Sequence, residues 1–350
     1  MRNAIFAREN KGIYERRGTL PYARPAVPMV LDKEALRARL EGRELAIIDA
    51  MADAFGALAR GEVVVPPVGH LDFTEGDQLR GDCHIKYGYI RGADRFVVKI
   101  ATGFYDNPKL GLPSGDGAVL VFSQKTGTLE AILLDGGDLT NLRTAAAGAL
   151  AARLLGPADI DAIGIAGTGV QARLQAAFLR EVTPCRKLVL WGRTNAAVLV
   201  CRTDLEALGY DVRVATSARD LAEATLIVTT TPSRSPILQG EWLRPGTHVT
   251  AVGADGGGKR ELDAAVFARA DVVVVDRLEQ CERYGDVSYA LAEGAIARDR
   301  LVELGDVVRD PARGRTSATA ITVADLTGVA VQDIAIADLA LTINAPASGG

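Results

Sequence analysis

Cysteine and histidine are scarce in this sequence, and their scarcity bears on metal and disulfide chemistry. Four cysteines and three histidines occur among 350 residues. The cysteines are far apart and form no Cys-x-x-Cys pair, and the histidines do not cluster. Such spacing indicates neither a disulfide framework nor a zinc site. We therefore predict a protein that binds no metal.

A basic surface and a long apolar run are also absent. The net charge of -4, without an arginine-rich stripe, excludes the usual nucleic-acid-binding classes. The opening "MRNAIFAREN" lacks the apolar core of a secretion signal, and no apolar run approaches the roughly 20 residues that span a bilayer. With 48 % hydrophobic residues, the chain instead suits two domains with their own cores. We expect a cytoplasmic α/β protein with no membrane or nucleic-acid partner.

From about residue 160 the sequence alternates short apolar runs with helical stretches. The predicted strands are 162–166, 187–191, 211–215, 226–230, 248–252 and 271–275. The predicted helices between the first four are 170–181, 195–209 and 217–224. Runs of β-branched residues without polar alternation are typical of strands buried on both faces. The alternation predicts a doubly wound parallel sheet of the Rossmann type.

The first strand of this series leads into a glycine loop, "AGTGVQA", with the spacing Gly-x-Gly-x-x-Ala. Gly167 permits a tight turn, Gly169 lets a pyrophosphate approach the backbone, and Ala172 keeps helix and strand close. The free N–H groups at the helix start favour phosphate. We therefore predict a dinucleotide site. Its predicted residues here are Gly167, Thr168, Gly169, Val170, Gln171 and Thr231.

The end of the second strand bears on the choice of cofactor. An acid that binds the ribose hydroxyls of NAD usually stands there, but this chain reads "LWGRTN", with Arg193 and Thr194. A guanidinium and a hydroxyl suit a 2′-phosphate, so NADP(H) is favoured over NAD(H). The alternative is that Arg193 is solvated or stacks on adenine, which would allow either cofactor.

The first half of the chain places two cations in regular elements. In "FVVKIA", residues 96–101, Lys99 shares a strand face with apolar neighbours because side chains alternate. A helix predicted to begin near Thr140 has Arg143 in its first turn. The helix dipole disfavours a cation at that place, so we expect another interaction to hold Arg143 there.

The stretch "DCHIKYGYI", residues 82–90, is separated from the Lys99 strand only by "RGADR", so the two are predicted to pair as a hairpin. Its two faces carry His84, Lys86 and Gly88 on one side and Cys83, Ile85, Tyr87 and Tyr89 on the other. We predict that the second, apolar face enters the core. The face of Lys86 is then free to line a substrate pocket.

Several blocks of the sequence together resemble the ornithine cyclodeaminase and mu-crystallin family. They are "VKIATGF" with the following "DNP" and "GLPS", "LLDGGDLTNLRTAAAGALAARLL", "IGIAGTGVQARLQ", "VGADGGGKRELD" and "DLTGVAVQD", spread from about residue 90 to 335. The resemblance implies a homodimer of two-domain chains. A substrate-binding and dimerisation domain of α+β type would span 1–145 and be rejoined by 325–350, and the Rossmann domain would span 146–324.

The resemblance also implies roles for three residues. Lys99 and Arg143 stand where the family binds the substrate carboxylate, and Asp255 matches the aspartate that manages protons on the substrate nitrogen. Two cations suit a planar carboxylate, and one acid can carry a proton at a carbon–nitrogen bond. Taken without the resemblance, Asp255 is a turn residue among glycines.

One family feature is missing. Members usually carry a further carboxylate-binding arginine in an early strand, but "VVVPPVGHLDF", residues 63–73, contains none. This departure puts ornithine cyclodeaminase activity in doubt. Our hypothesis is that Lys86 supplies the missing cation; the alternative is a solvated lysine on an exposed face.

These observations favour an NAD(P)-dependent oxidoreductase that acts on the Cα–N bond of an α-imino or α-amino acid. The preferred reaction is reduction of an imine, or ketimine, carboxylate. One alternative is an ornithine cyclodeaminase-type ammonia-lyase that recycles NAD within the site. Another is a non-catalytic, NADP-dependent binding protein of the mu-crystallin type.

Overall fold

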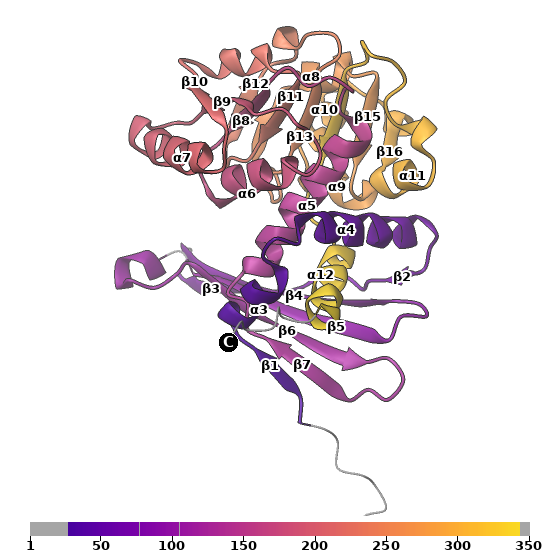
Figure 1. Ribbon diagram of the computed structural model, residues 1–350. Helices are drawn as coiled ribbons and strands as arrows, with labels where there is room; N and C mark the ends of the chain where they lie inside the picture. Colours follow the sequence, from indigo (N-terminus) through magenta and orange to yellow (C-terminus); the bar gives the residue numbers. More distant parts are fainter. Residues whose placement is uncertain (1–26, 77, 105, 344–350) are drawn as a thin grey trace, which may run out of the picture.

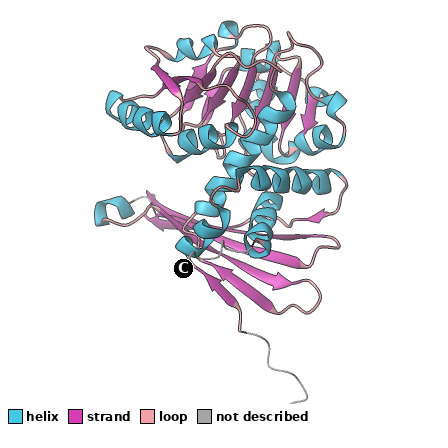
Figure 2. Ribbon diagram, viewed as in Figure 1, coloured by secondary structure: helices cyan, strands magenta, loops and turns pink. Residues whose placement is uncertain are grey.

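The computed structural model describes residues 27–76, 78–104 and 106–343. Two large β-sheets dominate it, a parallel sheet in the upper part of Figure 1 and a mixed sheet in the lower part. The helices α4 (Glu44–Ala59), α5 (Asp138–Leu155) and α12 (Ala330–Thr342) lie between the two sheets. Figure 2 shows the same division, with helices surrounding the parallel sheet and one face of the mixed sheet bare.

The parallel sheet has eight strands in the order β10-β9-β8-β11-β13-β17-β15-β16. They are β8 (Ile163–Ala166), β9 (Lys187–Trp191), β10 (Asp211–Val214), β11 (Leu226–Thr229), β13 (His248–Ala251), β15 (Val272–Val275), β16 (Leu301–Glu303) and β17 (Thr322–Asp325). The helices of this part are α6 (Val170–Leu179), α7 (Asn195–Ala207), α8 (Ala264–Arg269), α9 (Leu278–Tyr284), α10 (Val287–Ala292) and α11 (Leu304–Arg309). This is the Rossmann-type α/β fold that the sequence predicts.

The central strands form the core of this part. Every residue of β8, β11, β13, β15 and β17 is buried, as is typical of parallel strands covered on both faces. The strand order turns between β8 and β11, which are neighbours although β9 and β10 lie on the other side of β8. Ligands of such sheets bind outside the carboxyl ends of the strands at this point.

The structure differs from the sequence-based prediction in several elements of this part. All six predicted strands are present, but β16 and the central β17 were not predicted. The predicted helix 217–224 is a short 3-10 helix, η2 (Ala218–Glu223). There the Asp220 carboxylate accepts hydrogen bonds from the backbone N–H groups of Thr216 and Ser217, which curls the chain into a tight turn.

The mixed sheet has the order β1-β7-β6-β5-β4-β2, with β3 also paired to β4. Its strands are β1 (Met29–Leu31), β2 (Val63–Val64), β3 (Gly69–Glu75), β4 (Gln78–Ile90), β5 (Arg95–Phe104), β6 (Gly115–Ser123) and β7 (Leu129–Leu133). The accompanying helices are α3 (Lys33–Leu40) and the 3-10 helix η1 (Asn107–Leu110). The inner face packs against α4 and α12, and together they form one apolar core.

The hairpin of β4 and β5 is confirmed, but its faces are reversed relative to the prediction. Lys86 pairs with Lys99 across the two strands, so it shares the inner face with the buried Val97. The opposite face points outward, where Tyr87 and Tyr89 are 40 % and 36 % exposed. The prediction that this face enters the core is therefore wrong, because α12 packs on the lysine side. Cys83 is the exception and is buried.

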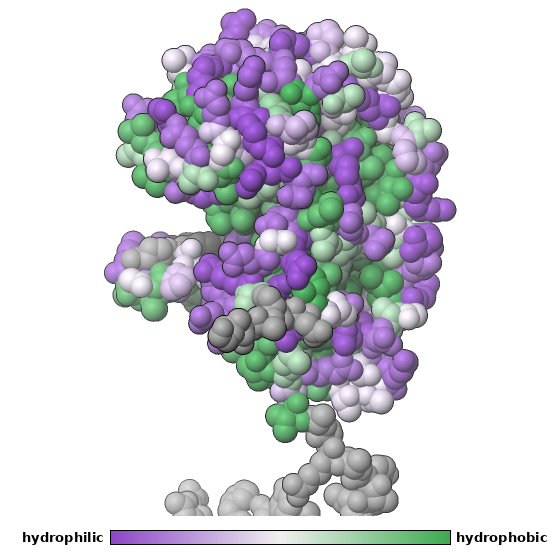
Figure 3. All heavy atoms as spheres, viewed as in Figure 1, coloured by the Kyte–Doolittle hydropathy of each residue, from purple (hydrophilic) through white to green (hydrophobic). Residues whose placement is uncertain are grey.

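Helices α5 and α12 connect the two sheets. Helix α5 begins at Asp138, two residues earlier than predicted, so Arg143 lies in its second turn and not its first. Helix α12 follows β17 of the parallel sheet directly and packs on β4 and β5 of the mixed sheet. The surface is hollowed on the left side of Figure 3, between the parallel-sheet part and the end of the mixed sheet that carries η1. No helix of the described ranges is long and apolar enough to cross a membrane.

Candidate active site

The loop after β8 has the geometry that a dinucleotide requires. Gly167 has a φ of +121°, and a Cβ there would lie 2.3 Å from Thr230 Oγ1. Gly169 is the N-cap of α6, and apart from its chain neighbours no atom lies within 4 Å of where its Cβ would stand. Ala172 is fully buried beneath the first turn. The chain at the start of α6 therefore leaves room beside Gly169, and these residues fit a pyrophosphate bound at the helix N-terminus.

The neighbouring residues of the loop are held by contacts within the chain. Arg173 donates to the carbonyl oxygens of Thr168 and Gly169, at 2.6 and 3.1 Å, and fixes the loop from behind. The side-chain amide of Gln171 donates to Asn141 O of α5 at 3.1 Å, so it links two helices. Val170 is 52 % exposed and lies beside a small pocket between α3, α5 and α6.

Arg193 and Thr194 lie where the sequence places them, directly after β9 at the carboxyl edge of the sheet. Both are exposed, and Arg193 forms no ion pair with any residue that the structure describes. Thr231 lies after β11, but its N–H and its hydroxyl both donate to Glu261 Oε1, at 2.6 and 2.7 Å. Its side chain is thus already engaged by the protein.

The two predicted carboxylate-binding cations meet at a third residue, Asp333 of α12. Lys99 Nζ and Arg143 Nε each lie 3.1 Å from the same oxygen, Asp333 Oδ1. All three residues are buried, at 8 %, 6 % and 3 % exposure. Lys99 also donates to Thr140 Oγ1 at 2.6 Å, and Arg143 donates to Gln332 Oε1 at 3.2 Å. Three elements, β5, α5 and α12, therefore build one charged cluster.

Opposing electrostatic effects set the protonation in this cluster. Burial lowers the pKa of Lys99, and the nearby Asp333 carboxylate opposes that shift. Burial alone would raise the pKa of Asp333, but Lys99, Arg143 and Lys86 outweigh it, so the pKa of that carboxyl lies below its ordinary value. Asp333 is thus ionised at neutral pH, which lets the two cations remain charged while buried.

Lys86 is a third cation beside this cluster. It is half-buried on the inner face of β4, and its Nζ lies 3.5 Å from Gly328 O. Burial lowers the pKa of Lys86, while Asp333 acts to raise it and Arg143 to lower it further. The structure therefore places Lys86 next to the Lys99 and Arg143 side chains, away from the outer face.

The loop after β17 packs against these cations and needs a glycine. Gly328 has a φ of +83°, and a Cβ there would lie 2.5 Å from the Arg143 guanidinium. The carboxylate of Asp276, at the end of β15, accepts from Thr327 N at 2.8 Å and from Gly328 N at 2.6 Å. Gln280 donates to Gly328 O at 3.0 Å. The cation cluster therefore adjoins the carboxyl edge of the parallel sheet.

Asp255 lies on the loop between β13 and β14 (Arg260–Leu262). Because β13 pairs with β17, this loop leaves the same edge of the sheet as the Gly328 loop. The Asp255 carboxylate is 55 % exposed and forms an ion pair with Lys259 at 2.5 Å. No contact within the described residues joins Asp255 to Lys99 or Arg143, so the structure does not bring the predicted acid and the predicted clamp together.

Sequence reasoning missed the residues that hold the site in place. Asp333 and Gln332 end the block "DLTGVAVQD", yet neither was assigned a role. The available signal was the presence of two acids, Asp333 and Asp338, in the apolar run "AVQDIAIADLAL", because a charge buried in an apolar helix requires a partner. Glu261 was missed too, as the contacts of a short strand such as β14 depend on tertiary packing.

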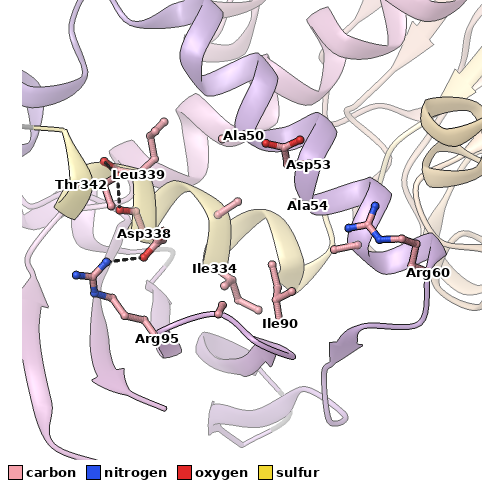
Figure 4. A pocket seen from close by; sticks show the side chains of 13 residues that line it. Ala50, Asp53, Ala54, Arg60, Ile90, Arg95, Ile334, Asp338, Leu339 and Thr342 are labelled. Atoms are coloured by element: carbon pink, nitrogen blue, oxygen red, sulfur yellow. Dashed lines mark hydrogen bonds and ion pairs between the residues drawn. The ribbon is translucent and has the colours of Figure 1, made fainter. Parts of the chain in front are cut away.

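A groove elsewhere contains none of these residues. It lies between α4, α12 and the turn from β4 to β5, with a volume of 380 Å³. Figure 4 shows its alanine and isoleucine lining, with the ion pair of Arg95 and Asp338 at one end and Arg60 at the other. The candidate site residues thus lie near the carboxyl edge of the parallel sheet and not in this groove.

The described residues also contain no group of three or more His, Cys, Asp or Glu side chains suited to a metal.

Comparison with known proteins agrees with this arrangement. Residues 27–342 match the model of the ornithine cyclodeaminase/mu-crystallin family. The chain belongs to this family. A putative dehydrogenase of Rhizobium meliloti is 45 % identical over 84 % of this chain and 89 % of its own length. As a member of the family, the chain is an NAD(P)-dependent oxidoreductase and uses a nicotinamide cofactor.

Two solved structures of family members share the fold. An archaeal alanine dehydrogenase dimer with bound NAD has a TM-score of 0.82 and 30 % identity, covering 89 % of this chain and 94 % of that one. The Δ1-pyrroline-2-carboxylate reductase of Thermococcus litoralis, in complex with NADH and L-proline, has a TM-score of 0.81 and 28 % identity, covering 89 % and 96 %. Both chains are matched nearly from end to end.

Proposed function

We propose that this family member reduces the C=N bond of an imine carboxylate to an amino acid. The observation that carries the proposal is the buried cluster of Lys99, Arg143 and Asp333, which lies beside the carboxyl edge of a sheet suited to a dinucleotide. Two cations that share one carboxylate keep further N–H donors for an incoming carboxylate. Lys86 lies within reach of the same place.

The proposed reaction needs a hydride at Cα and a proton on nitrogen. A nicotinamide cofactor held by the glycine loop would supply the hydride when bound. Lys99 and Arg143 orient the substrate through its carboxylate, and Asp255 gives the proton to the nitrogen as the C=N bond becomes a single bond. In the reverse direction Asp255 accepts that proton.

The similar proteins support a reaction at the Cα–N bond. One of the solved structures is a Δ1-pyrroline-2-carboxylate reductase with L-proline bound, and another is an alanine dehydrogenase. Both names describe chemistry at the carbon–nitrogen bond of an α-amino acid. The missing family arginine is the reason that we place reduction of an imine before cyclodeamination of ornithine.

A spectrophotometric assay tests the proposal. Purified protein with NADPH or NADH and Δ1-pyrroline-2-carboxylate is expected to lose absorbance at 340 nm in step with the formation of proline. Ammonia released from ornithine with NAD+, without net reduction of the cofactor, would instead identify a cyclodeaminase. Tight cofactor binding without turnover of a wide panel of imino and amino acids would identify a binding protein and contradict the proposal.

The role of Lys86 predicts a loss of substrate recognition. Lys86→Met keeps most of the stem and removes the charge, so kcat/KM for the imine should fall by about tenfold or more. Lys125→Met is the matched control, since Lys125 is an exposed lysine in the turn between β6 and β7, where it forms an ion pair with Asp94. Equal kinetics of the two variants would assign Lys86 to solvent and leave the missing arginine unexplained.

The role of Asp255 predicts a loss of turnover without a loss of cofactor affinity. Asp255→Asn keeps the shape of the side chain but cannot release a proton, so kcat should fall by about 10²- to 10⁴-fold. The dissociation constant of the cofactor, measured by fluorescence titration, should barely change. Near-normal turnover would leave Asp255 as the surface partner of Lys259.

The position of Arg193 leads us to propose NADP(H) as the preferred cofactor. Arg193→Asp replaces a phosphate partner with a repelling charge and should weaken NADPH far more than NADH in the same titration. Arg193→Ala, which removes the attraction without adding repulsion, should give an intermediate loss. The archaeal alanine dehydrogenase binds NAD and the Thermococcus litoralis reductase binds NADH. Tighter binding of NADH than of NADPH to the unmodified protein would overturn this proposal.

We also propose that two copies associate through the outer face of the mixed sheet. Val30, Tyr87, Tyr89 and Leu134 are at least 36 % exposed there, and Phe96 stacks on Phe122 with ring centroids 4.9 Å apart. An apolar sheet face of this kind is typical of a protein interface. The mass in solution should be twice 36.9 kDa, and a monomer at micromolar concentration would contradict the dimer.

A further inference from the structure

Glu261 has a buried carboxylate whose two oxygens accept four hydrogen bonds from two segments of the chain. It lies on β14 with no exposed surface. Its Oε1 accepts from the N–H and the hydroxyl of Thr231, at 2.6 and 2.7 Å. Its Oε2 accepts from Thr229 Oγ1 and Gly253 N, both at 2.8 Å. The carboxylate thus joins the chain at the end of β11 to the chain after β13.

Each of these loops leads into the candidate active site. Thr230, next to Thr231, donates to Ala166 O from both its N–H and its hydroxyl, at 2.8 and 2.9 Å, directly before Gly167. Gly253 stands two residues before Asp255. One side chain therefore connects the dinucleotide loop on one side with the proposed proton donor on the other.

Position 253 requires a glycine because the Glu261 carboxylate lies close to the backbone there. A Cβ at Gly253 would lie 2.2 Å from Thr231 O and 2.5 Å from Glu261 Oε2. Any other residue would push the two loops apart and break both contacts. The glycine of the "VGAD" turn and the buried Glu261 therefore depend on each other.

We propose that Glu261 is a positioning residue that fixes the cofactor loop relative to the loop of Asp255. It does not touch the reacting atoms in this arrangement; it acts through Thr231 and Gly253. The inference rests on the proposed function for the role of Asp255, but its effect on the cofactor loop does not depend on which substrate is reduced.

The protonation state of Glu261 matters because all four partners donate to it. Burial, with a smaller effect of the Asp286 carboxylate, raises the pKa of Glu261 to about 7. Asp286 of the neighbouring α10 accepts from Glu261 N at 2.7 Å, and the charge of Arg260 faces Asp286. Protonation of the Glu261 carboxylate below neutral pH places a hydrogen on one of its oxygens, and that oxygen then accepts fewer hydrogen bonds. The two loops should therefore be held less firmly as the pH falls.

Glu261→Gln tests the proposal in the full-length protein. The amide nitrogen would oppose a donor from one of the loops, so the dissociation constant of NADPH should rise by about tenfold or more. In the unmodified protein that constant should rise as the pH falls through 7, whereas in the variant it should vary little with pH. Fluorescence titration measures both without any substrate, so a failure of the imine assay leaves this test intact.

Glu303→Gln is the matched control. Glu303 ends β16 of the parallel sheet and accepts from Leu278 N at 2.9 Å and from Arg277 at 3.2 Å. The control should lower the melting temperature to a similar extent while leaving cofactor affinity and its pH profile unchanged. If both variants lose the same stability and both keep normal cofactor affinity, Glu261 is only structural and the proposal is wrong.

Thr229→Val provides a second variant if Glu261→Gln does not fold. Thr229 is fully buried and gives Glu261 one of its four hydrogen bonds. Removing one donor to the ionised carboxylate should raise the pKa of Glu261. The midpoint of the pH dependence of NADPH binding should therefore move to higher pH. An unmoved midpoint would show that Glu261 does not control the loops.

Discussion

The ion pairs of Asp333 with Lys99 and Arg143 are the interaction on which the proposed substrate site depends. Burying a cation without an oppositely charged partner costs roughly several kcal/mol. Without Asp333, neither Lys99 nor Arg143 could remain charged in this core. Asp333 accepts both on one oxygen. Because Asp333 lies on α12, the proposed substrate site on the mixed sheet depends on a residue that follows the parallel sheet in the sequence.

The geometry of the parallel sheet explains why the remaining groups converge. Adjacent strands β11, β13 and β17 end at one edge, so the loops with Thr231, Asp255 and Gly328 emerge side by side. Buried carboxylates hold these loops through backbone N–H groups, Glu261 on two of them and Asp276 on the third. Glycines stand where a carboxylate or a guanidinium comes too close for a side chain. The glycines within the loops and the buried carboxylates from distant parts of the chain thus both fix the positions of these loops.

The sequence predicted the parallel sheet well because its signals are local. Apolar runs, a glycine loop and strand–helix alternation each appear within a few residues. It failed for β17, a short strand whose burial comes from its neighbours. It also failed for the outward face of Tyr87, because alternation along β4 does not tell which face α12 covers. Asp333 lies 234 residues from Lys99 in the sequence, and no local pattern joins them.

The most direct test of this account compares Asp333→Asn with Asp338→Asn by urea unfolding. Both residues lie on α12 and pair with cations, but Asp333 is buried whereas Asp338 pairs with Arg95 at the surface. Loss of the buried charge should lower the free energy of unfolding by about 3 kcal/mol. Loss of the surface charge should cost no more than about 1 kcal/mol. Equal losses in the two variants would contradict the claim that Asp333 makes the buried cations of the site possible.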